Sequence, residues 1–248
     1  MSLRASVFAV LSLGSLGLLS LPAQTESVST LIGRVDGNQY IAPTGAFRVT
    51  IPVLPALGGS ITDTDNVVTF QDAFTTHQSI ACFKMDTTQR FEDDARGRKE
   101  YLVWFFRNFV EADFESRFPG ARIESAVFIR DLQNGAVLVY NILPGGSMFA
   151  NRIPAGPDKV PEAKRGNLVF VNNGNIYVLS IELAEKVIEG SSFNKTVTEE
   201  DSILRKRLFD LLAKMTFSAP EPQAQPAAQD KTPAPAADAA AKTGAPQP

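Results

Sequence analysis

One long stretch, residues 91–118, combines charged first turns with a middle that is crowded with aromatic side chains. Apolar residues recur in it at spacings of three and four, which places them on one face of a helix. The residues of this face are Leu102, Phe105, Phe106, Phe109 and Val110. Burial of each large apolar side chain stabilises a fold by about 1.5–3 kcal/mol. Strand-like runs flank the stretch on both sides, so the sequence predicts one helix that closes a face of a sheet.

Two further aromatic residues, Tyr101 and Trp104, lie at the edge of this helical face. We interpret them as the flank of the core. The alternative is an aromatic pair that faces a ligand, because each side chain joins an apolar ring to a polar tip. Tyr101 and Trp104 are therefore candidate ligand-binding residues.

Short runs of β-branched and aromatic residues indicate strands before and after the helix. The predicted strands are residues 47–51, 67–70, 79–83, 123–132, 136–143, 168–171 and 176–183. Asn134-Gly135 is a strong hairpin signal, and the other close pairs are also expected to be antiparallel. A second amphipathic helix begins near Thr198, its predicted N-cap, and a short edge segment follows at residues 216–218. Together these elements predict an α/β (α+β) domain, an antiparallel β-sheet flanked by helices.

Both ends of the chain have compositions that do not suit a core. Residues 1–23 join Arg4 to an apolar run, which is typical of a secretory signal peptide. The run is short for a membrane span, so we expect no integral span in the mature chain, although an uncleaved anchor is the alternative. We expect residues 24–38 to be a lead-in linker and residues 219–248, rich in Pro and Ala, to be a disordered tail. The sequence thus predicts one domain at residues 39–218, exported to the periplasm or the extracellular space.

Several classes of function are disfavoured by what the chain lacks. A net charge of −3 and a pI of about 5.3 argue against a nucleic-acid-binding protein. His77 is the single histidine and Cys82 the single cysteine, so no catalytic triad of the usual type is expected. Asp63, Asp65 and Asp72 surround one strand, but the glycine and glutamate of a calcium loop are missing. We therefore expect no metal, no cofactor and no catalytic residue.

The region 144–166 is predicted to be a long loop with prolines, glycines and basic residues. Its residues Arg152, Lys164 and Arg165 join Tyr101 and Trp104 as candidate ligand-binding residues. An alternative function follows from the same region, namely an envelope hydrolase that uses carboxylates or a serine near the loop. A structural envelope protein with the tail as a spacer is a third hypothesis.

The order of several strands, a helix, four strands and a last helix resembles the PsbP-like fold. The resemblance rests on Tyr40, on the segment GAFRVTIP at residues 45–52, and on the last helix running into MTFS at residues 215–218. It covers residues 39–218. That fold is an α/β/α sandwich, seen in the extrinsic PsbP subunit of photosystem II and in small exported bacterial proteins of the DcrB type. The resemblance implies a non-catalytic binding or assembly protein of the bacterial cell envelope, with an envelope protein or a small ligand as its partner.

Overall fold

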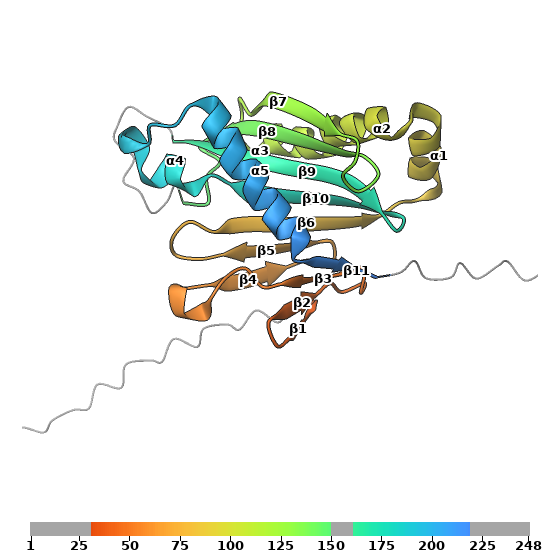
Figure 1. The fold of residues 1–248 in the computed structure, drawn as a ribbon, viewed down its shortest axis with the longest axis horizontal. Helices are drawn as coiled ribbons and strands as arrows, with labels where there is room; N and C mark the ends of the chain where they lie inside the picture. The colour runs from red at the N-terminus through yellow and green to blue at the C-terminus, as the bar shows by residue number, and fades with distance from the viewer. Residues whose placement is uncertain (1–30, 150–160, 219–248) are drawn as a thin grey trace, which may run out of the picture. The chain divides into compact units, whose positions relative to one another are not determined.

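The computed structural model describes residues 31–149 and 161–218 of the chain. In this part, two antiparallel sheets are present (Figure 1). The smaller sheet has the order β1 (Arg34–Asp36), β2 (Gln39–Ile41), β3 (Phe47–Thr50) and β11 (Met215–Phe217). The larger sheet has the order β4 (Ser60–Asp63), β5 (Val67–Gln71), β6 (His77–Lys84), β10 (Asn175–Glu182), β9 (Glu162–Asn172), β8 (Ala136–Pro144) and β7 (Arg122–Ile129).

The helical segments lie between and after these strands. They are η1 (Pro55–Leu57), α1 (Thr87–Arg96), α2 (Arg98–Phe105), the π-helical segment η2 (Phe106–Glu111), α3 (Ala112–Arg117), α4 (Ala184–Ile188), η4 (Gly190–Ser192) and α5 (Val197–Ala213). In the described part of the chain, no helix is long and apolar enough to cross a membrane. The predicted signal peptide and the predicted tail lie outside the described residues.

The three predicted hairpins of the larger sheet are confirmed. Strands β5 and β6, β7 and β8, and β9 and β10 pair antiparallel. The turn after β7 places Asn134 at φ 58°, and the turn after β9 places Asn173 at φ 48° and Gly174 at φ 74°. Asparagine and glycine tolerate these positive values with little strain, which is why they mark tight hairpins.

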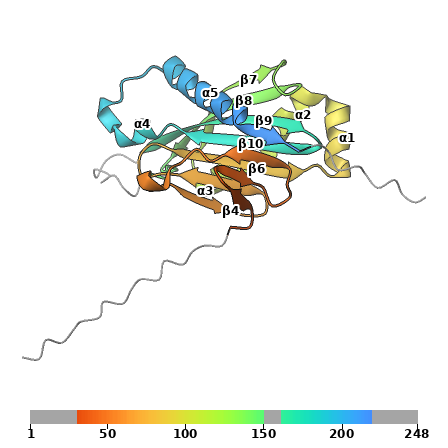
Figure 2. The ribbon, with the colours of Figure 1, turned by 60° about the horizontal axis from the view of Figure 1, so that its bottom comes forward.

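Alternating side chains of the central strands divide the core into two clusters. Leu138 on β8 packs in a cluster with Leu204 and Leu208 of α5, together with side chains of the smaller sheet. Its neighbour Val139 packs on the other side with Leu102 of α2. Successive side chains of a strand point to opposite faces, so α5 and the smaller sheet cover one face and α2 covers the other. Figures 1 and 2 show α5 lying across β8, β9 and β10. The predicted α/β/α sandwich is confirmed.

The prediction of one helix over residues 91–118 is wrong. The helical region begins earlier, at the N-cap Asp86, and breaks at Gly97, which adopts φ 78° and ψ 152°. A residue with a side chain rarely adopts this backbone conformation, so the glycine separates α1 from α2. No residue of α1 is buried, and Phe91 is 68% exposed.

The predicted buried face of this helix is also partly wrong. Tyr101, Leu102, Phe105 and Phe106 are buried as a group, whereas Phe109 is 50% exposed. The reason is the π-helical segment η2, in which hydrogen bonds span five residues instead of four. The wider turn shifts Phe109 away from the face that α-helical spacing predicts. Tyr101 therefore belongs to the core and Phe109 lies at its margin.

Other element boundaries differ from the sequence prediction. Strand β1 lies inside the predicted lead-in linker, and α4 lies between the predicted strand 176–183 and the predicted last helix, where no element was predicted. The N-cap of α5 is Thr196 rather than Thr198, because Thr196 and Glu199 form a capping box. The predicted loop 144–166 is shorter than expected, since β9 already begins at Glu162. The edge segment after α5 is confirmed as β11, which pairs with β3.

Candidate functional site

A groove of about 780 Å³ lies between the larger sheet and the helical segments η2 and α3. Side chains of four strands form a mixed floor, with the polar residues Thr62, Thr69, Gln71, Ser79 and Ser180 beside the apolar residues Val67, Ala81, Phe83 and Val178. Helical side chains form an apolar wall: Phe105, Phe109, Val110, Phe114 and Phe118. Small-molecule sites in proteins usually measure about 300–1,000 Å³ and combine apolar walls with a few polar groups. The groove therefore has the size and lining of a ligand-binding site.

The floor of the groove follows from the sequence of β5. Its residues Val68 and Phe70 are buried in the cluster shared with α5, while Val67, Thr69 and Gln71 alternate with them and are half-buried. The period of two places these three side chains on the opposite face of the sheet, where they line the groove. Helix α2 packs instead against central-strand residues such as Val139 and Val169.

A row of three ionisable side chains crosses the sheet at one end of the groove. Arg165 of β9 is the cross-strand partner of Glu182 of β10, and its Nη2 donates to Glu182 Oε2 over 3.3 Å. His77 of β6 places Nδ1 3.6 Å from the same oxygen. Glu182 is fully buried and also accepts hydrogen bonds from the Ser147 hydroxyl and the Met148 backbone N–H. The buried carboxylate of Glu182 thus contacts Arg165, His77, Ser147 and Met148 at the polar end of the groove.

Burial determines the protonation of this row. Desolvation lowers the pKa of His77 to about 3, and the nearby positive charge of Arg165 acts in the same direction. His77 is therefore neutral at neutral pH, and its contact with Glu182 is not an ion pair. Burial lowers the pKa of Arg165 and Glu182 opposes this effect, but a guanidinium stays charged at neutral pH. The charges of Arg165 and Glu182 consequently offset each other.

Ser147, Glu182 and His77 do not have the arrangement of a hydrolytic triad. In a triad the serine donates to the histidine, and the carboxylate orients the histidine from its other side. Here the carboxylate lies between the two, because the hydroxyl of Ser147 donates to Glu182 and His77 also faces Glu182. His77 is not placed to take the proton of Ser147. These three residues therefore do not form a nucleophile–base pair.

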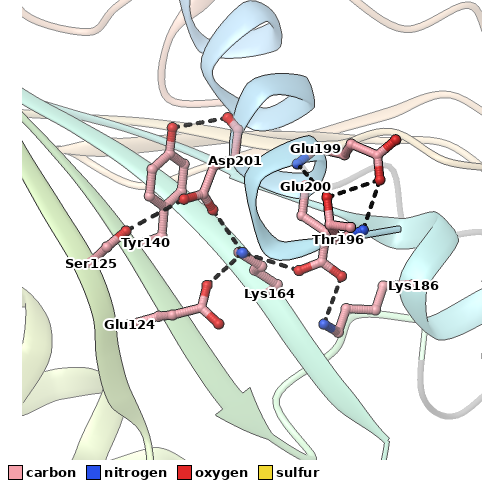
Figure 3. A network of polar contacts seen from close by, with 9 residues as sticks. All are labelled: Glu124, Ser125, Tyr140, Lys164, Lys186, Thr196, Glu199, Glu200 and Asp201. Atoms are coloured by element: carbon pink, nitrogen blue, oxygen red, sulfur yellow. Dashed lines mark hydrogen bonds and ion pairs between the residues drawn. The ribbon is translucent and has the colours of Figure 1, made fainter. Parts of the chain in front are cut away.

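Lys164 lies on the opposite face of the sheet from Arg165 and is fully buried. Figure 3 shows its Nζ between three carboxylates, at 2.5 Å from Glu124, 3.0 Å from Glu200 and 2.7 Å from Asp201. Burial alone would lower the pKa of Lys164, but hydrogen bonds to Asp201, Glu124 and Glu200 outweigh it and raise the pKa above its usual value. Lys164 therefore ties the first turn of α5 to β9 and β7 and does not line the groove.

Tyr101 and Trp104 stack on each other beside the groove. Their ring centroids are 5.8 Å apart, and Tyr101 is completely buried. The Trp104 ring meets the Phe109 ring edge-on, with 5.6 Å between the ring centroids, so Trp104 contacts a residue of the groove wall. The guanidinium of Arg96 lies 5.2 Å from the centre of the Trp104 ring. The remaining candidate, Arg152, lies outside the described residues.

Two of the three aspartates that surround β5, Asp63 and Asp72, have structural partners. Asp63 accepts hydrogen bonds from the backbone N–H groups of Ile32 and Gly33 and from the hydroxyl of Tyr40. Asp72 accepts backbone hydrogen bonds within its own turn. Over residues 31–149 and 161–218, no group of three or more His, Cys, Asp or Glu side chains is placed to hold a metal ion.

Three residues at the polar end of the groove were not predicted as site residues from the sequence. Glu182 closes an otherwise apolar strand run, and a charged residue in such a position signals a buried partner. His77 precedes the predicted strand 79–83, but it is the first residue of β6 and is buried. Ser147 carries no recognisable signal, since its role depends on where Glu182 lies.

Comparisons with known proteins give structural similarity only. No family model and no curated protein sequence matches the chain. Among solved structures, it is similar to cyanobacterial PsbP from Synechocystis sp. PCC 6803, with a TM-score of 0.46 and 13% identity over 75% of this chain and 99% of that chain. It is also similar to the Ran-binding protein Mog1p of Saccharomyces cerevisiae, with a TM-score of 0.43 and 10% identity over 77% of this chain and 97% of that chain.

A protein from Bacteroides thetaiotaomicron is similar with a TM-score of 0.38 and 9% identity, over 74% of this chain and 49% of that protein. All three TM-scores lie below 0.5 and all three identities below 25%, so these similarities say nothing about function. The function of this chain is therefore inferred from its own groove.

Proposed function

We propose that this chain is an exported, non-catalytic binding protein of the bacterial cell envelope that holds a small amphipathic ligand in its groove. The observation that carries the proposal is the groove itself, with its phenylalanine wall facing a floor in which hydroxyl and amide side chains alternate with apolar ones. Such a lining shields an apolar body on one side and offers hydrogen bonds on the other. A concave site of this size suits a small molecule better than the flat contact of a protein partner.

An uncharged dye, N-phenyl-1-naphthylamine, tests the binding role because its emission rises in apolar surroundings. The test compares Phe109→Ser with the matched control Phe91→Ser. Both phenylalanines are exposed and both lie in the same helical region, but only Phe109 lines the groove. We expect the wild type and Phe91→Ser to bind the dye alike. Phe109→Ser should bind about fivefold to tenfold more weakly, which corresponds to about 1–1.4 kcal/mol.

Two results would contradict the binding role. One is a wild-type protein that does not raise the emission of the dye. The other is an equal effect of the two substitutions, which would place the dye outside the groove. Urea denaturation of both variants checks that each retains its fold.

The export part of the proposal rests on the composition of residues 1–23. Fractionation of cells that express the chain with a C-terminal epitope tests it. We expect a mature protein in the periplasmic or extracellular fraction whose N-terminal sequence begins after Ala23. Recovery from the membrane fraction of a protein that retains Arg4 would favour the uncleaved anchor instead.

A further inference from the structure

We infer that the groove binds an uncharged ligand, with a flat apolar body against the phenylalanine wall and a hydrogen-bonding head group, such as a carboxamide, against Arg165 and His77. This inference rests on the proposed function and specifies the chemical class of the ligand. Three features of the groove support it: the aromatic wall, the unused hydrogen-bonding groups at its inner end, and the balance of charge around it.

The wall is built from aromatic rings that contact one another. Phe105 and Phe109 have ring centroids 5.1 Å apart, and Phe83 lies 6.4 Å from Phe105. Phe109 leaves half of its surface uncovered although its ring belongs to this group. Aromatic rings favour offset or edge-on contacts with other flat rings over separations of about 4.5–7 Å. A flat apolar body would extend the row of rings and cover the exposed half of Phe109.

The inner end of the groove has hydrogen-bonding groups without partners. Arg165 uses Nη2 for the Gly146 carbonyl and for Glu182, whereas its Nη1 donates to no residue of the described chain. Its Nε is covered by protein and also has no acceptor there. His77 turns Nδ1 toward Glu182, which favours the tautomer with the proton on Nδ1 and leaves Nε2 as an acceptor. Both side chains line the groove. A head group that both accepts and donates, as a carboxamide does, complements them.

Arg165, Arg117 and Asp113 line the groove, and with the buried Glu182, which does not line it, their charges balance in two pairs. Arg165 is paired with the buried Glu182, and Arg117 of the wall is paired with Asp113. His77 adds no charge at neutral pH because burial keeps its pKa low. A carboxylate on the ligand would therefore be a second negative charge beside Glu182, and taking an unpaired charge out of water is unfavourable. An uncharged head group avoids this repulsion.

Three naphthalene probes of matched shape test the inference by isothermal titration calorimetry. They are 2-naphthamide, the anion 2-naphthoate and the hydrocarbon 2-isopropylnaphthalene. For the wild type, we expect 2-naphthamide to bind at least about tenfold more tightly than 2-naphthoate. The amide and the anion differ little in shape, so the ratio of their dissociation constants reports the charge preference of the site.

The variants Arg165→Lys and Arg122→Lys test where the head group binds. Each retains the positive charge, but lysine lacks the fixed fork of N–H donors of arginine. Arg165→Lys should weaken 2-naphthamide binding by about tenfold and leave 2-isopropylnaphthalene binding unchanged. The same substitution at Arg122, which is exposed, pairs with Glu162 and does not line the groove, should change neither.

Each contrary result separates the inference from the function on which it rests. Tighter binding of 2-naphthoate than of 2-naphthamide, or equal binding of the two, would overturn the uncharged head group while the groove remains a binding site. Equal effects of Arg165→Lys and Arg122→Lys would overturn its placement at Arg165. If none of the three probes binds the wild type, the proposed function fails together with the inference. The ratio of the wild-type constants decides the question even if Arg165→Lys does not fold.

Discussion

Lys164 and Arg165 are consecutive residues of β9, yet their side chains lie on opposite faces of the larger sheet and in different environments. Lys164 is held among carboxylates beneath α5, and Arg165 reaches Glu182 at the inner end of the groove. In the sequence they are neighbouring basic residues of the predicted loop 144–166. Because a strand alternates its side chains, one of them fixes a helix and the other shapes the candidate site.

Lys164→Met should destabilise the fold strongly without altering the groove. Removing one member of a buried charge network leaves the other charges uncompensated, which costs about 3–5 kcal/mol. The matched control is Lys206→Met, because Lys206 forms an exposed ion pair with Asp210. Loss of an exposed pair changes stability by about 0–1 kcal/mol. Urea denaturation measures both values, and equal effects would contradict the structural role of Lys164.

Phe105→Ala should destabilise the protein far more than Phe109→Ala. Phe105 is buried against the sheet, where truncation of a phenylalanine costs about 3–5 kcal/mol including the cavity. Phe109 is half exposed, so we expect a loss of about 1 kcal/mol, the size of an ordinary substitution. Chemical denaturation of the two variants gives the comparison. Equally large losses would show that Phe109 faces the core, as α-helical spacing alone predicts.

His77 should make the protein less stable as the pH falls below the ordinary range of histidine. Its pKa is lowered from 6.5 to about 3 in the folded protein, so the unfolded chain takes up a proton in a pH range where the folded chain does not. The contribution is fully present above pH 6.5 and is lost as the pH falls toward 3. The loss approaches about 1.4 kcal/mol per pH unit between these limits. We expect His77→Gln to flatten this dependence.

The single histidine of the chain allows a direct measurement. In an untagged protein, the one imidazole resonance observed by NMR should not titrate between about pH 8 and pH 5, because the folded-state pKa lies below that range. Urea midpoints of the wild type and of His77→Gln over the same range give the thermodynamic counterpart. An imidazole that titrates near its ordinary pKa would show that His77 is hydrated.

Truncation after Ser218 should leave the stability nearly unchanged, whereas truncation after Lys214 should not. The longer variant retains β11, whose Met215 and Phe217 pair with β3, and the Ser218 N–H donates to the Ala46 carbonyl. We expect the first truncation to change the unfolding free energy by less than about 1 kcal/mol. Loss of β11 would expose β3 and part of the core. A large loss from the first truncation would contradict the predicted disorder of residues 219–248.

The fold class was accessible from the sequence because its signals are local. Asn134-Gly135 fixes a hairpin wherever the chain lies, since the turn needs positive φ at both positions. The alternation of β5 and the leucine spacing of α5 depend only on neighbours along the chain. The break at Gly97 and the π-helical segment were not accessible, because a glycine inside a helical pattern is ambiguous and the wider turn leaves no signature in spacing.

The candidate site was only partly accessible. Arg165 was selected as a basic residue, but its partners Glu182 and His77 come from other strands, so sequence proximity gave no means of joining them. Tyr101 was expected to flank the core and is instead fully buried within it. The side to which each residue points depends on the register of the strands and on the helix phase, which contacts between distant segments determine.

The sequence by itself determined the antiparallel strands, their hairpins, the amphipathic last helix and the class of fold, because turn chemistry and periodicity act over a few residues. Only the tertiary structure decided that Lys164 and Arg165 separate, that the π-helical turn moves Phe109 to the rim, and that three strands bring Arg165, Glu182 and His77 into one row. Strand pairing sets these positions between residues far apart in the chain, and the groove exists only where the helical wall and the sheet floor meet.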